Sequence, residues 1–227
     1  DTLKRARNDC GAVLSRAGRS ADHQQQIRDE LAAREVPLEA VERARDFYDD
    51  VLGWLDDRIE RYLDTEVGED WRAAGAELLP DHDVEIPLRD PETVERDELS
   101  VWAEGTYDGG LWRSLSTIGA AVEATIDEVG LARQPVAAGV GVLMKRWWEA
   151  DHATSLREIE LEDSPADERS VDRAWEAAYT AGLIRFECMP GTALREVFDA
   201  LGGGILMSAT LEPLDVFGEV AGLEELR

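Results

Sequence analysis

Lysine is nearly missing from this sequence. Lys4 and Lys145 are the only two, so arginine supplies almost all of the 24 basic residues, which face 50 aspartates and glutamates and give a formal net charge of -26. Such an excess of carboxylates is typical of proteins that stay dissolved in concentrated salt, where the Debye length falls to ~3 Å and self-repulsion is screened. We interpret the acidity as a halophile-like surface. An acidic surface that mimics nucleic acid or binds a basic protein remains the alternative.

Cysteine and long apolar runs are also scarce. Cys10 and Cys188 are far apart and belong to no CxxC pair, which excludes a disulfide framework and a metal knuckle and predicts reduced thiols. The longest apolar stretch, Val136 to Met144, is interrupted by glycines and falls short of the ~18 residues of a membrane span. No signal-peptide pattern is present. These absences predict a cytoplasmic protein without a membrane segment.

Complete catalytic motifs are missing as well. The sequence contains no GxxxxGK[ST], GxGxxG, HExxH or GxSxG string, so no catalytic residue is predicted in it. The histidines His23, His82 and His152 fall in separate predicted elements. The run Asp81-His82-Asp83 resembles a metal-ligand cluster in composition only, because a metal needs three or four ligands brought together by geometry. We interpret that run as a solvated loop and predict no metal or cofactor bound by this chain.

Helical periodicity dominates the first four fifths of the chain. Residues 1–34 have a helical pattern, and after Pro37 apolar residues recur every three or four positions, at Val41, Ala44, Tyr48, Val51, Leu55, Ile59 and Tyr62. Further helices are predicted at 69–79, from Pro91, at 111–129 with Gly130 as the cap, at 136–147 and at 167–182. One exposed strand is predicted at 154–162. We therefore expect a mainly α fold, with residues 1–182 as a helical domain.

The last 45 residues have a different pattern. Residues 183–188 are typical of a strand, 192–201 of a short helix and 205–207 of a fully buried strand. This strand-helix-strand order is typical of a parallel α/β sheet. We expect residues 183–227 to form a small α/β unit in which the strand at 205–207 lies beside the strand at 183–188.

The most informative string follows that last strand. Ser208-Ala209-Thr210 comes directly after Ile205-Leu206-Met207 and is followed by Leu-x-Pro and an amphipathic helix. Ligands of parallel sheets lie at the carboxyl ends of the strands, so both hydroxyls would lie where a nucleotide binds and could relay a change there to a neighbouring domain. The alternative is a polar strand end in which Thr210 caps the next helix.

This string resembles the third helicase motif of the XPD/DinG family of superfamily-two DNA helicases, here in a haloarchaeal-like version. The resemblance covers about 20 residues. It implies a RecA-like motor domain for 183–227, an Arch insertion for 1–182, and a role for Ser208, Ala209 and Thr210 in coupling ATP hydrolysis to unwinding. It also implies a whole protein that uses ATP and Mg, holds an iron-sulfur cluster outside this chain, moves along single-stranded DNA and acts in DNA repair or replication.

The phosphate loop, the acid box, the cluster cysteines and the second motor domain of that family are not in this sequence. We therefore expect a monomeric fragment without activity of its own; the chain also starts without a methionine. Translocation polarity, repair pathway and protein partner are not predicted. The alternative function is a non-enzymatic acidic helical adaptor or interaction domain.

Two stretches combine features that bind single-stranded DNA. Lys145 and Arg146 precede Trp147 and Trp148, and cations next to aromatics attract the phosphate backbone and stack on bases. The periodicity places Trp147 in the core and Trp148 about 100° further around the helix, where it could be exposed. The first helix adds three more cations, Lys4, Arg5 and Arg7. The alternative for these is a solvated face that pairs with neighbouring acids.

Overall fold

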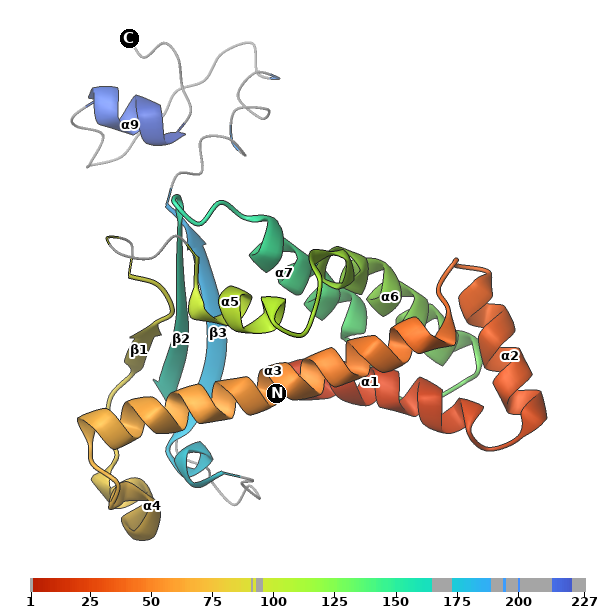
Figure 1. Ribbon diagram of the computed structural model, residues 1–227, viewed down its shortest axis with the longest axis horizontal. Coiled ribbons are helices and arrows are strands. Elements are labelled where there is room, and N and C mark those ends of the chain that lie inside the picture. Colours follow the sequence, from red (N-terminus) through yellow and green to blue (C-terminus); the bar gives the residue numbers. More distant parts are fainter. Residues whose placement is uncertain are drawn as a thin grey trace.

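The computed structural model describes residues 2–90, 92, 96–164, 173–188, 194, 200 and 214–221. The described chain is mainly helical, as predicted, with a small three-stranded antiparallel sheet at one end of the helical body (Figure 1). The sheet order is β1-β2-β3. None of the described helices combines the length and the apolar character that a membrane span requires.

The first three helices form the long axis of the body. α1 (Thr2–Ala17) and α2 (Ala21–Ala32) form a hairpin, so the helical stretch predicted over 1–34 is two helices. The break lies at Ser20, whose side chain caps α2 by accepting a hydrogen bond from the His23 amide at 3.2 Å. α3 (Leu38–Glu66) confirms the periodicity predicted after Pro37, and its buried side packs on α1. Figure 1 shows α3 crossing most of the body.

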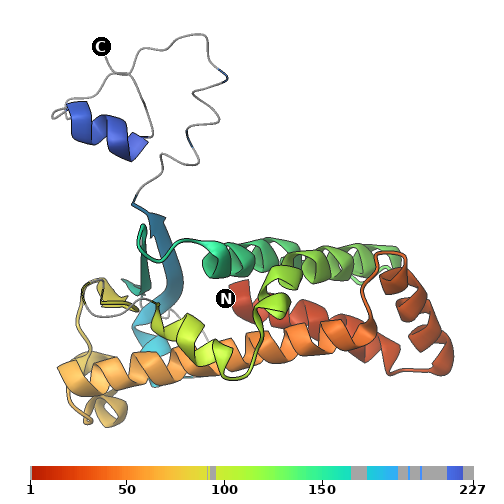
Figure 2. The same cartoon turned by 45° about the horizontal axis from the view of Figure 1, so that its top comes forward.

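α6 (Gly109–Glu128) and α7 (Ala137–Glu149) pack closely side by side (Figure 2). Their backbones approach at two glycines: a side chain on Gly119 would collide with the Ala137 carbonyl, and one on Gly141 with the Leu115 carbonyl. α6 confirms the helix predicted at 111–129. Gly130 follows it in the left-handed conformation, with φ of 65°.

The segment between α3 and α6 differs more from the prediction. The helix predicted over 69–79 is a single turn, α4 (Trp71–Ala74), followed by a 3₁₀ turn (Gly75–Leu78). β1 (Val84–Pro87) was not predicted. α5 (Glu98–Glu104) begins after Asp97 rather than at Pro91, because the Asp97 side chain caps it through the Ser100 amide.

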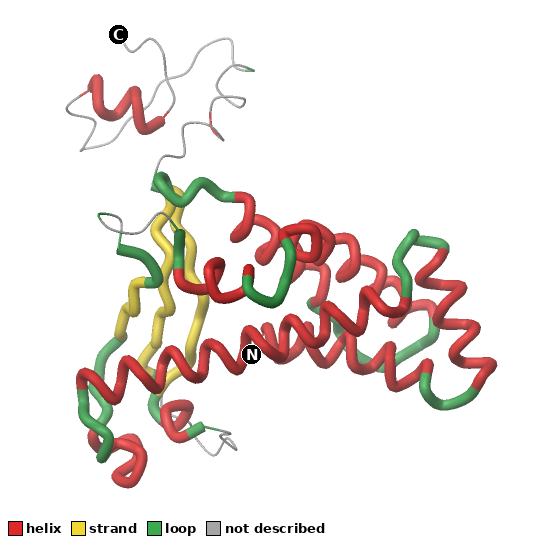
Figure 3. The backbone as a smooth tube through the Cα atoms, in the orientation of Figure 1, coloured by secondary structure: helices red, strands yellow, loops and turns green. Residues whose placement is uncertain are grey.

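β2 (Ser155–Asp163) is the central strand and pairs with both β1 and β3 (Tyr179–Glu187), as Figure 3 shows. The prediction of an exposed strand at 154–162 is therefore wrong about burial, since Ile159 and Leu161 lie in the core. The helix predicted up to Gly182 is also wrong: within the described part, Ala174–Ala177 is a 3₁₀ turn and strand β3 follows.

The strand predicted at 183–188 is thus part of the longer β3, which pairs antiparallel with β2 and crosses the boundary expected between residues 182 and 183. The helix predicted at 192–201 and the strand at 205–207 lie outside the described residues, except for isolated positions 194 and 200. The amphipathic helix predicted after Leu-x-Pro is present as α9 (Leu214–Ala221). A RecA-like sheet is not shown by these elements.

The close packing of α6 on α7 predicts opposite effects for two alanine substitutions in one helix. Gly141→Ala should lower the free energy of unfolding by about 1–3 kcal/mol, because the added methyl group forces the two backbones apart. Gly139→Ala, with no neighbouring atom within 4 Å of the new methyl group, should raise it by up to about 1 kcal/mol through better helix propensity. Denaturant unfolding measures both. If both substitutions change the free energy of unfolding equally, the close contact between the backbones of α6 and α7 is contradicted.

Candidate nucleic-acid interface

The last turns of α7 carry the candidate DNA-binding residues Lys145, Arg146 and Trp148. The start of α7 is held against α1 by Asp9, whose carboxylate accepts a hydrogen bond from the Val136 amide at 2.7 Å. Trp147 is buried in the core with 4% exposure, as the periodicity predicted. Packing of Trp147 sets the rotation of α7 and therefore the sides on which its neighbours lie.

Trp148 is half-buried and is packed against the core. Its ring stacks on Trp112, with centroids 5.3 Å apart and an interplanar angle of 24°, and the Arg96 guanidinium carbon lies 4.8 Å from its centroid. Gly109 leaves room for the indole, since a side chain there would meet Trp148 at 2.8 Å. The ring therefore lacks the free face that the sequence suggested.

Lys145 and Arg146 differ from most other cations of the protein. Within the described part of the chain, neither has a carboxylate within salt-bridge distance, and Arg146 is exposed while Lys145 is half-buried. Most of the remaining described cations are paired with Asp or Glu. These two side chains are therefore available to attract phosphate groups.

The three cations of α1 each have a partner within the protein. Lys4 forms an ion pair with Glu176 at 2.7 Å, and Arg7 forms one with Asp49 at 2.7 Å. Arg5 donates a hydrogen bond to the Gln134 carbonyl at 3.1 Å. For Lys4 and Arg7 the alternative of a face paired with acids is confirmed. The exposed Arg7 pair is worth at most about 1 kcal/mol, so it does not fix that cation firmly.

A groove of about 590 Å³ brings Lys4 and Arg146 to one place. Its cations also include Arg185 of β3, which the sequence analysis did not single out. Apolar side chains from four elements line the rest of it, among them Leu3, Leu55, Ile59, Val140, Met144 and Leu183. The N-terminal end of α1 points toward the sheet (Figure 2). Lys145, Trp148, Arg5 and Arg7 do not line the groove.

A buried polar network joins the end of α7 to the sheet. Asp97, fully buried, accepts hydrogen bonds from Arg157 Nη1 at 2.6 Å, from Trp147 Nε1 at 3.2 Å and from the Ser100 hydroxyl at 2.7 Å. The other two nitrogens of Arg157 also donate hydrogen bonds, Nε to Ser155 Oγ at 3.2 Å and Nη2 to the Ala150 carbonyl at 2.8 Å. This network fixes the C-terminal turn of α7, and with it Lys145 and Arg146, on the sheet.

Neither this network nor the positions of Arg96 and Arg185 could be predicted from the sequence patterns. A weak signal existed for the network: Asp97 stands three residues before Ser100 in an N-cap position, and Arg157 is a charge inside a strand pattern. Neither signal says that the two side chains meet, because they are 60 residues apart in sequence.

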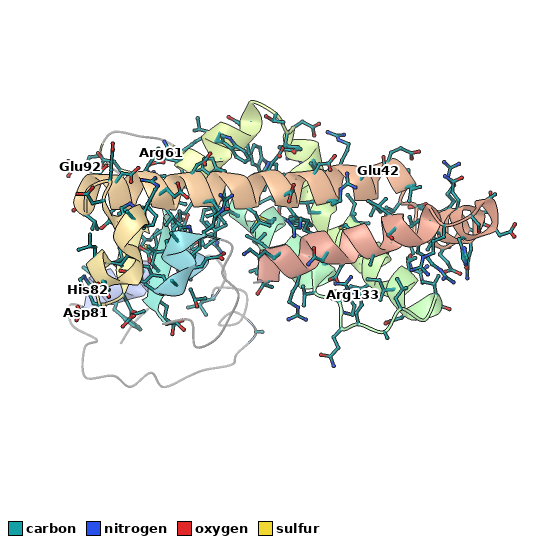
Figure 4. The ribbon with its side chains drawn as sticks, turned by 90° about the horizontal axis from the view of Figure 1, so that it is seen from below. Glu42, Arg61, Asp81, His82, Glu92 and Arg133 are labelled. Carbon is teal, nitrogen blue, oxygen red and sulfur yellow. The ribbon has the colours of Figure 1, made fainter. Side chains whose placement is uncertain are left out.

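Two other sequence predictions concern places away from α7. Ser208, Ala209 and Thr210 lie outside the described residues. Asp81 and His82 lie at one end of the molecule (Figure 4), with strongly exposed side chains whose nearest polar atoms are 3.9 Å apart. Asp83 accepts a hydrogen bond from the Asp163 amide at 2.8 Å. In the described ranges, no group of three or more His, Cys, Asp or Glu side chains is placed to hold a metal ion.

His152 lies beside the network and predicts a pH effect. Burial, reinforced by the positive charge of Arg157, lowers the pKa of His152, although Asp97 lies 3.3 Å away and opposes the shift. The unfolded chain, with a pKa near 6.5, then binds this proton more readily than the folded chain. The free energy of unfolding should therefore fall as the pH drops from about 6.5 through the lower folded pKa.

Urea titrations between pH 7 and 5 check this expectation. His152→Gln should flatten the pH dependence over that range, whereas His82→Gln, at an exposed position, should leave the slope of the wild-type protein unchanged. An unchanged slope in His152→Gln would contradict the role given to this side chain.

Comparison with family models, with curated proteins and with solved structures gives no significant match. The candidate interface is therefore defined by its own geometry. It consists of two cations on α7 that have no carboxylate partner among the described residues, the tryptophan stacked on Trp112 next to them, and the groove between α7, α1 and β3.

Proposed function

We propose that this chain is part of an ATP-dependent DNA helicase of the XPD/DinG type, in which the helical body is an Arch-like insertion and residues 183–227 return to a RecA-like motor domain. The observation that carries the proposal is the string Ile205-Leu206-Met207-Ser208-Ala209-Thr210-Leu211-Glu212-Pro213. The helix that should follow it is present as α9, which begins directly after Pro213. Proline is favoured at helix starts because it needs no backbone donor there.

The arrangement of the body supports the same proposal. An inserted domain must return the chain close to the place where it left the host domain. Residues 2–4 of α1 and residues 180–185 of β3 line the same groove, so these two segments, far apart in sequence, lie together. The predominance of helices in between is in line with an Arch-like insertion.

In this proposal single-stranded DNA is contacted by α7. Lys145 and Arg146 can bind phosphates without first breaking an ion pair with a carboxylate of the described chain, whereas Lys4 and Arg7 would have to give up Glu176 and Asp49. Base stacking on Trp148 would require Arg96 to move from its position over the ring. We therefore assign the contact to the cations, with Trp148 as the side chain that supports their helix.

The double substitution Lys145→Ala/Arg146→Ala tests the DNA contact. It should weaken binding of an oligothymidylate, and the slope of log K against log salt should become shallower by about 1.4, because about 0.7 counterions are released per phosphate contact on single strands. Arg43→Ala/Arg45→Ala is a matched control, since both of those cations are exposed and paired with acids. Fluorescence anisotropy over a salt series measures both variants, and identical slopes would contradict the assignment.

The proposal that residues 183–227 belong to a motor domain is tested in the full-length protein. Thr210→Ala should leave nucleotide binding nearly intact and reduce unwinding more than ATP hydrolysis, because a coupling hydroxyl relays the hydrolysis step rather than holding phosphates. The 227-residue chain alone should hydrolyse no ATP. Strand-displacement and phosphate-release assays measure the two activities. Equal loss of both in Thr210→Ala would indicate a packing defect instead.

One observation favours the alternative of an interaction domain. Trp54 and Trp102 lie 5.9 Å apart, centroid to centroid, in a second groove that also contains Asp57, Glu60, Asp64 and Glu98. Of these carboxylates, Glu60 and Asp64 pair with Arg72 and Glu98 pairs with Arg58, whereas Asp57 has no ion pair with a described cation. Aromatic rings next to carboxylates suit a basic segment of another protein. Tight binding of an arginine-rich peptide together with no binding of single-stranded DNA would favour this function over the helicase.

A further inference from the structure

The groove between α7, α1 and β3 is large enough to hold a small organic molecule. Its volume of about 590 Å³ lies in the range of ligand pockets, which are mostly apolar and contain a few well-placed polar groups. The two helices, the strand and also α3 contribute apolar side chains to its walls, among them Leu3, Leu55, Val140 and Leu183. By contrast, charged residues make up most of the second groove, at Trp54 and Trp102.

The charges along the groove leave one arginine without a counter-ion. The two carboxylates among its described residues are occupied, since Asp56 pairs with Arg173 at 3.0 Å and Glu176 pairs with Lys4 at 2.7 Å. Arg146, exposed in the last turn of α7, also lines the groove and has no ion pair with a described carboxylate. Within a chain of net charge -26, the groove is therefore a place of local positive charge.

A second group at the groove is a buried donor without an acceptor. Trp175, in the 3₁₀ turn Ala174–Ala177, lines the groove and is 5% exposed, and its Nε1 has no hydrogen-bond partner among the described residues. A buried N–H group that lacks a partner is unfavourable, and an acceptor atom of a bound molecule satisfies it. Arg185 of β3 is not in the same situation, because it is paired with Glu187 at 3.2 Å.

We propose that this groove binds small amphipathic organic anions, that is, molecules with an apolar body and a carboxylate. The body lies against the apolar walls and covers Leu143, which is 60% exposed at the groove. The carboxylate accepts hydrogen bonds from Arg146, whose planar guanidinium matches it in geometry and charge. A cationic molecule in the same place leaves Arg146 without a partner and adds a repulsion.

Occupation of the groove has one consequence for the proposed function, and this step alone rests on it. A bound carboxylate withdraws Arg146 from the phosphates of single-stranded DNA, so the two ligands compete for this side chain. Lys145 lies on the same helix but does not line the groove. The two roles are therefore separable, because a substitution of Lys145 acts on DNA binding and not on the groove.

Calorimetric titration of the 227-residue protein with decanoate and with decylammonium tests the preference for an anion. Decanoate should bind saturably, and decylammonium at least about tenfold more weakly. Because the net charge of -26 attracts cations and repels anions, this order reports the local charge of the groove. Arg146→Gln should weaken decanoate binding by about tenfold through loss of the charge-assisted hydrogen bonds, whereas Lys145→Gln should leave it unchanged.

A second pair of variants tests the apolar wall. Leu143 and Val142 are both exposed side chains of α7, and of these two only Leu143 lines the groove. Leu143→Asp should weaken decanoate binding by at least about tenfold, because it removes an apolar contact and repels the anion, and Val142→Asp should not. The indole N–H resonance of Trp175, assigned by its loss in Trp175→Phe, should shift on addition of decanoate, while that of Trp54 should stay in place.

The remaining outcomes overturn the inference. Absence of saturable decanoate binding, or an equal affinity for decylammonium, excludes an anion site. Equal losses in Arg146→Gln and Lys145→Gln mean that decanoate responds to overall charge, and equal losses in Leu143→Asp and Val142→Asp, or an unshifted Trp175 resonance, place the molecule outside the groove. Absence of DNA binding or of helicase activity leaves all of these results unaffected, so a failure of the proposed function is distinguishable from a failure of this one.

Discussion

The buried ion pair between Asp97 and Arg157 is the interaction on which the joining of helices and sheet depends. Removing a charge from water costs several kcal/mol per ion, so such a pair is tolerated only where the remaining donors and acceptors are also bonded. Here the pair itself is 2.6 Å long, and its further partners include Trp147 and Ala150 at the end of α7. Because apolar contacts are non-directional, they would not by themselves hold β2 at one position against α5 and α7. The ion pair does so.

The long helices could be predicted because their information is local. A stripe of apolar residues repeated over about six turns, as from Val41 to Tyr62, is stabilised by burying one face of the helix. The sheet could not be predicted in the same way. β2 contains Arg157 and Glu158 in its first half and therefore resembles an exposed strand, yet both are buried, and Arg157 is paired with Asp97 from a distant segment. Short segments such as Tyr179–Gly182 fit both periodicities, so the predicted helix there was wrong.

Only the charges of the candidate interface could be predicted from the sequence. A helical period of 100° placed Trp147 in the core correctly, but the environment of Trp148 depends on Trp112 and Arg96, which come from other segments. Likewise, the sequence gives the charge of each side chain but does not show which group that side chain pairs with. The sequence favoured Trp148 over the cations as the contact, and the structure instead separates the cations: Lys4 and Arg7 are paired with acids, whereas Lys145 and Arg146 are not paired with any described carboxylate.

The difference between paired and unpaired cations matters for how a chain with a net charge of -26 could approach DNA. In dilute salt the summed field would repel the phosphates at long range, since the Debye length is then ~10 Å or more. In molar salt the screening length shrinks to ~3 Å, so only groups in direct contact with a phosphate act on it. Under these conditions Lys145 and Arg146, on a helix fixed by the buried network, can still act on a phosphate that touches them. The surrounding carboxylates are screened from it. The same screening weakens counterion release, the main source of affinity for phosphates. In the proposed helicase these cations would therefore mainly orient a bound strand, and their contribution to affinity would shrink as the salt concentration rises.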